Sequence, residues 1–220
     1  MKSLVDCDMV RVKICGITSL DDALYSIKNG AAVLGFNFYT KSPRYIDPEK
    51  AARIITLLSP FVLIAGVFVN EKIEYIKTIQ RLCGLDMIQL HGDETPEYCG
   101  KLDQYKVIKA IRVKDDEDVR KIMRYNVHGI LFDAFHPEQY GGTGARFQWE
   151  LLKLVDAPMM NKVIVAGGIT PDNITGLLEE CSPAMIDVCS GVEQERGIKD
   201  RSKIKKLFRS VSDYNNKVIR

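Results

Sequence analysis

The sequence predicts an α/β protein that forms a single (β/α)8 barrel, or TIM barrel, extending as one domain over residues 1–220. Short runs rich in Val and Ile recur along the chain, and a helical pattern follows each of them. Eight such pairs in series favour parallel strands joined by right-handed helical crossovers. Eight strands also close a barrel, and 220 residues are near the usual length of about 250. The alternative is a doubly wound open sheet with fewer strands.

The expected strands are apolar or alternating runs that end at glycines or helix caps. In the first strand, residues 10–15 alternate up to Cys15, Gly16 then allows a sharp turn, and Thr18 can cap a helix. The eight expected strands are Val10–Cys15, Ala32–Phe38, Val62–Val69, Met87–His91, Val107–Arg112, Gly129–Asp133, Val163–Ala166 and Ala184–Val188.

The helices between these strands begin at recognisable signals. Asp47, Thr95 and Thr170 each precede a proline and an acidic residue, which is typical of the first turn of a helix. The expected helices are Ser19–Asn29, Pro48–Leu58, Glu71–Leu82, Thr95–Leu102, Asp115–Arg124, Trp149–Leu154, Pro171–Glu180 and Asp200–Tyr214. A long glycine-rich stretch, Ala134–Phe147, follows the sixth strand, and loops of this length are usually functional or disordered.

Composition and charge disfavour several classes of protein. The net charge of +2 gives no reason to expect nucleic acid or a membrane as a partner. The longest apolar run, Phe61–Val69, is too short to span a bilayer, and the acidic N-terminus does not resemble a signal peptide. The six cysteines have neither metal-site nor disulfide spacing, so we expect reduced thiols in a cytoplasmic protein without a metal.

Alternation sorts the side chains of each strand into those inside and those outside the barrel, because residues two apart share a face. The helices cover the outside and need apolar partners, which places Val12 and Ile14 outside and Cys15 inside, with Lys13 beneath it. The same rule directs further polar residues to the same end of the interior: Gln89, His91, Asp133 and Asp187. Buried polar groups cost free energy unless they are paired or used, so this end is a candidate site.

Each of these residues also has a purely structural interpretation. A buried cysteine is often just a small apolar residue, an aspartate at a strand end often caps a turn, and His91 can anchor the turn at Gly92. Their convergence at one end of the predicted barrel favours the functional interpretation.

Glycines follow the seventh and eighth strands, where barrels of this kind often bind phosphate. Gly167 and Gly168 follow the seventh strand, and Ser190 and Gly191 follow the eighth. Glycines leave backbone N–H groups accessible to an anion, although they can also serve only to make tight turns. We expect these four residues to bind a phosphate group.

Several motifs together resemble the phosphoribosylanthranilate isomerase family of tryptophan biosynthesis. They cover residues 10 to 200: V-K-I-C-G-I-T at 12–18, K-S-P-R-Y-I at 41–46, G-V-F-V-N at 66–70, Q-L-H-G at 89–92, L-F-D at 131–133, Y-G-G-T-G at 140–144, A-G-G-I at 166–169 and I-D-V-C-S-G-V-E at 186–193. A-G-G-I alone is common to many phosphate-binding barrels, whereas the set as a whole is highly specific.

The resemblance implies a (β/α)8 barrel that catalyses the Amadori rearrangement of N-(5-phospho-β-D-ribosyl)anthranilate to 1-(2-carboxyphenylamino)-1-deoxy-D-ribulose 5-phosphate without a cofactor. It implies Cys15 as general base, Asp133 as general acid, Arg44 as the group that binds the anthranilate carboxylate, and Asp187 as an auxiliary. We also expect Gln89 and His91 to contact this small phosphorylated substrate. Oligomeric state stays open between monomer and homodimer.

The chemistry suits these residue types. Ring opening needs a proton on the ribose ring oxygen, which Asp133 can supply when protonated. A thiolate at Cys15 can then remove the C2 proton if neighbours lower its pKa from the usual value of about 8.5, and Lys13 is a candidate neighbour. Arg44 suits a planar carboxylate because its guanidinium donates two parallel hydrogen bonds, although it can also be a solvated loop residue.

Two departures from the family pattern leave roles open. Cys189 stands where the family often has Ser, and Ala145 and Arg146 follow Gly144 where many members have Lys. Two other functions stay possible. One is the related sugar isomerase of histidine biosynthesis, alone or as a second activity, although that enzyme has Asp where this chain has Cys15. The other is a phosphate-binding barrel without activity, although both the acid and the base are present here.

Overall fold

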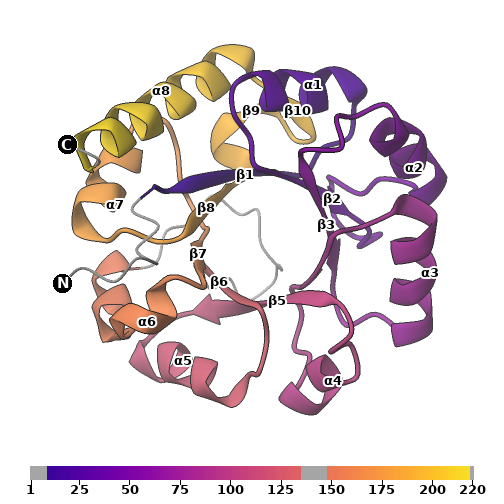
Figure 1. The fold of residues 1–220 in the computed structure, drawn as a ribbon, viewed down its shortest axis with the longest axis horizontal. Helices are drawn as coiled ribbons and strands as arrows, with labels where there is room; N and C mark the ends of the chain where they lie inside the picture. The colour runs from indigo at the N-terminus through magenta and orange to yellow at the C-terminus, as the bar shows by residue number, and fades with distance from the viewer. Residues whose placement is uncertain (1–8, 135–147, 219–220) are drawn as a thin grey trace.

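Eight parallel strands close into a barrel with helices around it, as the sequence predicts (Figure 1). The computed structural model describes residues 9–134 and 148–218. Neighbouring strands pair in chain order, and the last pairs with the first. The strands are β1 (Arg11–Cys15), β2 (Val33–Asn37), β3 (Leu63–Phe68), β4 (Met87–Leu90), β5 (Lys106–Val113), β6 (Gly129–Ala134), β7 (Val163–Val165) and β8 (Met185–Val188).

Three helices begin at caps at or next to those that the sequence indicates, with Ser19 rather than Thr18 in the first of them. Ser19, Asp47 and Thr95 each accept a hydrogen bond from a backbone N–H of the first turn. The α-helices are α1 (Leu20–Lys28), α2 (Pro48–Thr56), α3 (Ile73–Cys83), α4 (Pro96–Gly100), α5 (Asp116–Arg120), α6 (Ala157–Met160), α7 (Ile174–Glu180) and α8 (Arg201–Val218).

Three expected helices differ from the prediction. Thr170 does not cap a helix, because α7 begins only at Ile174, after Asn173. The segment 115–124 begins as α5 but continues as a 3₁₀-helix, η1 (Lys121–Arg124). The segment 149–154 is wholly a 3₁₀-helix, η2 (Trp149–Leu154), and no side chain caps its first turn. Short segments without a capping side chain often take this tighter form, because it lets the end of a helix satisfy its backbone groups within a few residues.

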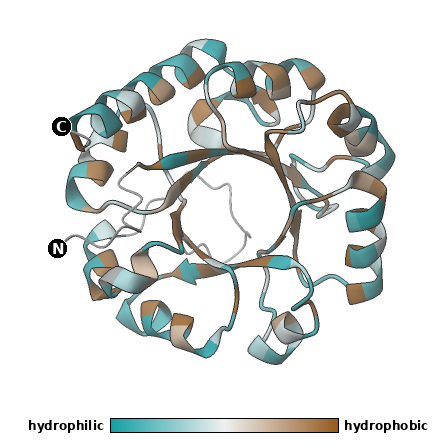
Figure 2. Cartoon of the chain, viewed as in Figure 1, coloured by the Kyte–Doolittle hydropathy of each residue, from teal (hydrophilic) through white to brown (hydrophobic). Residues whose placement is uncertain are grey.

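The core has the two layers that alternation predicts. The larger lies between barrel and helices and includes Val12 and Ile14 of β1. The smaller fills the barrel interior and consists of five buried residues, with Met87 and Met185 packed against it: Ile108, Ala110, Leu131, Ile164 and Ala166. Figure 2 shows strands that are hydrophobic along much of their length and helices whose hydrophilic residues face outward. The sheet is therefore covered on both faces, as a parallel barrel requires.

A small two-stranded hairpin follows β8 and was not predicted from the sequence. After the 3₁₀ turn η3 (Ser190–Val192), β9 (Glu193–Glu195) pairs with β10 (Ile198–Lys199). The Thr18 hydroxyl donates to the Gly197 carbonyl at 2.6 Å, which ties the hairpin to the loop after β1. Strands of two or three residues are too short to show a periodic pattern, which is why sequence reasoning missed them.

Some predictions fall on residues outside the described ranges. These are the interpretation of the N-terminal segment, the glycine-rich stretch after β6 with its Y-G-G-T-G motif at 140–144, and the substitution at Ala145 and Arg146. Within the described ranges, no helix has the length and apolar character needed to cross a membrane.

Candidate active site

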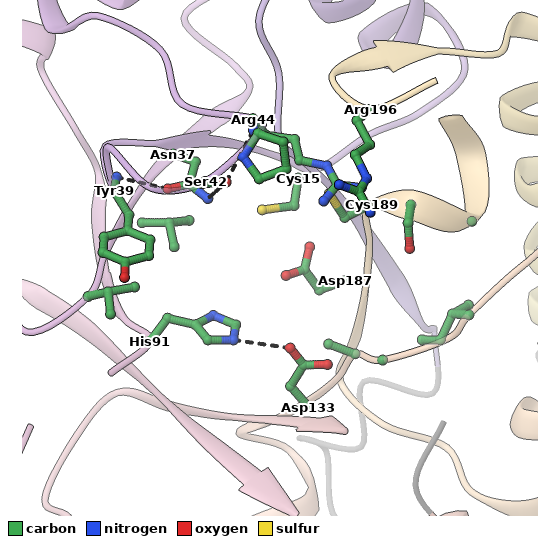
Figure 3. A pocket seen from close by; sticks show the side chains of 18 of the residues that line it. Cys15, Asn37, Tyr39, Ser42, Arg44, His91, Asp133, Asp187, Cys189 and Arg196 are labelled. Carbon is green, nitrogen blue, oxygen red and sulfur yellow. Dashed lines mark hydrogen bonds and ion pairs between the residues drawn. The ribbon is translucent and has the colours of Figure 1, made fainter. Parts of the chain in front are cut away.

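A cavity of about 650 Å³ opens at the carboxyl ends of the strands (Figure 3). Its lining includes nine of the ten residues that sequence reasoning assigned to a site: Cys15, Arg44, His91, Asp133, Gly167, Gly168, Asp187, Ser190 and Gly191. The tenth, Gln89, is fully buried and does not line the cavity. Gln89 is therefore placed to orient His91 rather than to contact a ligand, which corrects the expectation of direct contact.

The Cys15 sulfur shares a confined space with the Lys13 ammonium group. Both residues lie on β1, and Cys15 stands opposite Gly35 of β2. A Cβ atom at position 35 would lie only 2.8 Å from Cys15 Sγ and 2.9 Å from Lys13 Nζ. Glycine at position 35 therefore lets the thiol and the ammonium group occupy the same side of the barrel wall.

The surroundings of Cys15 favour its thiolate form. The Cys189 side chain hydrogen-bonds Cys15, and the positive charges of Lys13 and Lys199 lie nearby. These neighbours hold the pKa of Cys15 well below its usual value even though burial opposes ionisation. The same hydrogen bond, together with burial, raises the pKa of Cys189, so Cys189 is the member of the pair that keeps its proton. Cys15 thus has the properties of a general base.

A buried ion pair joins the first and last strands beneath Cys15. Lys13 Nζ lies 2.8 Å from Asp187 Oδ2, and the two residues are register partners across β1 and β8. Burial opposes the charge on Lys13, but Asp187 and Cys15 together raise the pKa of Lys13 above its usual value. Burial also raises the pKa of Asp187 to about 7, against the effect of Lys13. Lys13 thereby remains a cation beside the sulfur.

Asp133 lies across the cavity from Cys15 and is held by His91 (Figure 3). Asp133 Oδ2 is 3.1 Å from His91 Nε2, and its Oδ1 accepts a hydrogen bond from the Ala134 backbone N–H at 2.8 Å. On the other side of the ring, His91 Nδ1 lies 2.9 Å from Gln89 Nε2. Gln89, His91 and Asp133 thus form a chain that leads from the buried interior to the cavity.

The row of hydrogen bonds from Gln89 through His91 can form with Asp133 in either of its protonation states. With the Gln89 amide nitrogen on His91 Nδ1, the proton of a neutral ring sits on Nε2 and is donated to Asp133. If the Gln89 amide turns, its oxygen accepts from Nδ1–H, and Nε2 accepts a proton held by Asp133. Gln89 Oε1 has no hydrogen-bond partner among the described residues. Gln89 and His91 can therefore pair with Asp133 whether its carboxyl group donates or accepts the hydrogen bond.

Arg44 lines the cavity, but Glu193 of β9 already engages its guanidinium. Arg44 Nη2 lies 2.7 Å from Glu193 Oε2, and Nε donates to the same carboxylate at 3.2 Å. Lys199 Nζ also contacts Glu193, at 3.1 Å. Despite burial, these two cations hold the pKa of Glu193 below its usual value. Arg44 is therefore oriented by a buried ion pair rather than being a solvated loop residue.

The loops after β7 and β8 need glycine for two separate reasons. Gly167 and Gly168 have φ values of +79° and +63°, a region in which other residues are strained. At position 191, a Cβ atom would lie 1.8 Å from the Ile169 carbonyl oxygen, so the two loops pack backbone against backbone. All four residues expected to bind phosphate line the one cavity. Their glycines are therefore more than turn formers, because they keep side chains out of the space between the loops.

The cavity also contains residues that sequence reasoning did not single out. Asn37 ends β2 and fixes the loop that carries Arg44, because its amide donates to Ser42 Oγ at 3.0 Å. The alternation of Val33, Gly35 and Asn37 could have placed it inside the barrel. Arg196 lines the cavity from the β9–β10 turn, which no sequence pattern revealed.

The family assignment rests on a match over most of the chain. Residues 12–210 match the sequence profile of a family described as "N-(5'phosphoribosyl)anthranilate (PRA) isomerase". The chain belongs to this family. A relative from Trichlorobacter lovleyi named N-(5'-phosphoribosyl)anthranilate isomerase is 46% identical over 93% of this chain and 99% of its own.

Solved structures of phosphoribosylanthranilate isomerases share the fold. The crystal structure from Thermotoga maritima has a TM-score of 0.85 at 41% identity, and it covers 93% of this chain and 100% of that one. Another such isomerase, solved in complex with reduced 1-(o-carboxyphenylamino)-1-deoxyribulose 5-phosphate, has a TM-score of 0.82 at 39% identity, with the same coverage. Among the described residues of this family member, no group of His, Cys, Asp and Glu could hold a metal ion.

Proposed function

We propose that this chain converts N-(5-phospho-β-D-ribosyl)anthranilate to 1-(2-carboxyphenylamino)-1-deoxy-D-ribulose 5-phosphate, an Amadori rearrangement in tryptophan biosynthesis. The observation that supports this most is the placement of Cys15 and Asp133 on one cavity, with neighbours that favour the thiolate of Cys15. Family membership adds independent support. So does the relative solved in complex with a reduced 1-(o-carboxyphenylamino)-1-deoxyribulose 5-phosphate.

Asp133 supplies the proton that opens the ribose ring. The proton goes to the ring oxygen, the bond from C1 to that oxygen breaks, and the nitrogen lone pair forms a C1–N double bond. The iminium that results withdraws electrons from C2 and makes its proton more acidic. His91 keeps the Asp133 carboxyl in place at 3.1 Å and can exchange the proton with it.

Cys15 removes the C2 proton as a thiolate. The electron pair of the C–H bond forms a C1–C2 double bond, and the iminium nitrogen receives the displaced pair. The resulting enol-amine becomes the ketone when C1 gains a proton and the C2 hydroxyl loses one. Lys13 maintains positive charge beside the sulfur and favours the thiolate before the transfer.

Binding groups surround these two residues. The loops with Gly167, Gly168, Ser190 and Gly191 are proposed to hold the phosphate with backbone N–H groups. Arg44, oriented by Glu193, faces the carboxylate end of the substrate. Asp187 also lines the cavity and is proposed as an auxiliary group beside Lys13 and Cys15.

The wider setting follows from this chemistry. We propose one domain over residues 1–220 that acts as a monomer or homodimer on a small phosphorylated substrate, with neither nucleic acid nor membrane as partner. A catalytic thiol must stay reduced, which favours the cytoplasm. General acid–base chemistry at Cys15 and Asp133 completes the rearrangement without a cofactor.

The substrate is fluorescent, so loss of its fluorescence on adding the protein tests the proposal. The expected result is rapid loss with the wild-type chain and a loss slower by orders of magnitude with Asp133→Asn, which keeps the shape of the side chain. If the wild-type chain binds the reduced product analogue but does not turn the substrate over, the chain is a binding protein rather than an isomerase.

A further inference from the structure

A second arginine reaches the cavity, and no described residue neutralises it. Arg196 occupies the turn between β9 and β10, is exposed, and lines the cavity. Figure 3 shows its side chain extending from the hairpin toward the edge of the cavity where Arg44 lies. Within residues 9–134 and 148–218, Arg196 forms no hydrogen bond or ion pair.

The backbone that carries Arg196 is fixed, unlike an ordinary surface loop. Gly197 donates its N–H to Glu193 Oε1 at 3.3 Å, and its carbonyl accepts from Thr18 Oγ1 at 2.6 Å. Lys199, which is buried, donates its backbone N–H to Asp22 Oδ2 at 3.3 Å. The hairpin is thus held on both sides, and the Arg196 side chain projects from a set position.

Positive side chains outnumber negative ones in the ion pairs at this edge of the cavity. Arg44 and Lys199 both contact the single carboxylate of Glu193, at 2.7 and 3.1 Å. Among the described residues no carboxylate forms an ion pair with Arg196, and like charges close together disfavour a site that holds no anion. An incoming anion would relieve this repulsion, so the site is prepared for a negatively charged group.

We propose that Arg196 binds the aryl carboxylate of the substrate and thereby contributes to specificity. The inference rests on the proposed function, whose substrate carries two anions, a phosphate and a carboxylate. The glycine loops after β7 and β8 offer backbone N–H groups suited to the phosphate, which leaves the carboxylate for the arginines. Glu193 already occupies Nε and Nη2 of Arg44, whereas Arg196 can offer a complete planar fork for two parallel hydrogen bonds.

The test compares two stable ligands that differ only in the carboxylate. One is reduced 1-(o-carboxyphenylamino)-1-deoxyribulose 5-phosphate, and the other is the same compound with an unsubstituted phenyl ring. Titration calorimetry measures the Kd of both for the wild-type chain, Arg196→Gln, Arg196→Lys and Arg209→Gln. Arg209 is an exposed arginine of α8 that does not line the cavity, so it controls for the loss of one positive charge.

Arg196→Gln is expected to weaken binding of the carboxylate ligand by about tenfold or more, since a hydrogen bond to a charged group is lost. Binding of the phenyl ligand should stay within about twofold, which also shows that the variant is folded. Arg196→Lys should lose less of the affinity for the carboxylate ligand, because lysine keeps the positive charge although it lacks the planar fork. Arg209→Gln should bind both ligands as the wild-type chain does.

Two results would overturn the assignment. If Arg196→Gln loses the same affinity for both ligands, Arg196 acts on the phosphate or through its charge alone. If it loses affinity for neither ligand, Arg196 does not belong to the site. Failure of the wild-type chain to bind either ligand is a different outcome, because it contradicts the proposed function itself and the inference falls with it.

Discussion

Three neighbours favour the thiolate of Cys15, the proposed base, and one of them stands where the family often has serine. Lys13 and Lys199 supply positive charge, and Cys189 supplies a hydrogen bond. Cys189 is itself positioned by Lys199, whose Nζ donates to its backbone carbonyl at 3.3 Å and to its sulfur at 3.9 Å. The position where the family often has serine therefore keeps a proton donor beside the base, although the donor is now a thiol.

Removing this donor should raise the pKa of Cys15. In Cys189→Ala the thiolate loses its hydrogen bond, so a smaller fraction of Cys15 is ionised at neutral pH. The rate of alkylation of Cys15 by iodoacetamide, followed by peptide mass spectrometry over a range of pH, should therefore show its midpoint at higher pH than in the wild-type chain. Cys189→Ser restores a donor and should return the midpoint toward the wild-type value.

Three other thiols of the described residues interfere little with this measurement. Burial raises the pKa of Cys83 and Cys99 to about 11 and that of Cys181 to about 12, so they react slowly near neutral pH. An unchanged Cys15 midpoint in Cys189→Ala would show that Lys13 and Lys199 alone set the ionisation of the base.

The ion pair between Lys13 and Asp187 joins β1 and β8, the first and last strands of the barrel. Lys13 is fully buried, so its ammonium group depends on Asp187 for charge compensation. Taking two charges out of water is costly, and a buried pair often contributes little to stability compared with apolar residues of similar size. The pair at this seam is therefore better explained by the charge that it places beside Cys15 than by stability.

A double-mutant cycle separates these two roles. Asp187→Leu alone leaves Lys13 as an uncompensated buried cation and should lower the free energy of unfolding by about 3–5 kcal/mol in urea denaturation. Lys13→Met combined with Asp187→Leu removes both charges and should recover most of that loss. Activity should not recover in the double variant, because the base has lost its neighbouring cation.

Recovery of activity together with stability would contradict this explanation. It would mean that the pair serves only the packing of the seam, and that the ionisation of Cys15 depends on Cys189 and Lys199.

Over the whole molecule, apolar and polar residues divide the barrel interior along its axis. Apolar side chains such as Leu131 and Ile164 fill the centre, while Lys13, His91 and Asp133 gather toward the carboxyl ends of the strands. A barrel with only a structural role would bury apolar side chains at both ends, because unpaired polar groups are costly. Buried polar groups such as His91, Asp133 and Asp187 therefore lie where the cavity opens.

Sequence reasoning recovered this arrangement where a repeating pattern exists. Alternation in β1 sorted Val12 and Ile14 outward and Cys15 inward, because the period of a strand directly sets the direction of its side chains. The family resemblance added Arg44, which no periodicity could place in the cavity.

Contacts between residues that are far apart in the sequence could not be predicted from it. Lys13 and Asp187 are 174 positions apart, and Arg44 and Glu193 are 149 apart, so only the closed barrel shows that they touch. Arg196 was missed because its hairpin is too short to form a pattern. Gln89 was placed on the correct face, but alternation could not tell that it lies below the cavity rather than on its wall.

Cys15 is the group that we propose takes the C2 proton of phosphoribosylanthranilate. The most direct test is steady-state turnover by Cys15→Ser, followed by loss of substrate fluorescence, since the hydroxyl occupies nearly the same space but is a far weaker base near neutral pH. The expected result is a kcat lower by orders of magnitude, on the order of 10²–10⁴-fold, with little change in KM. A near-normal kcat in Cys15→Ser would show that another group is the base.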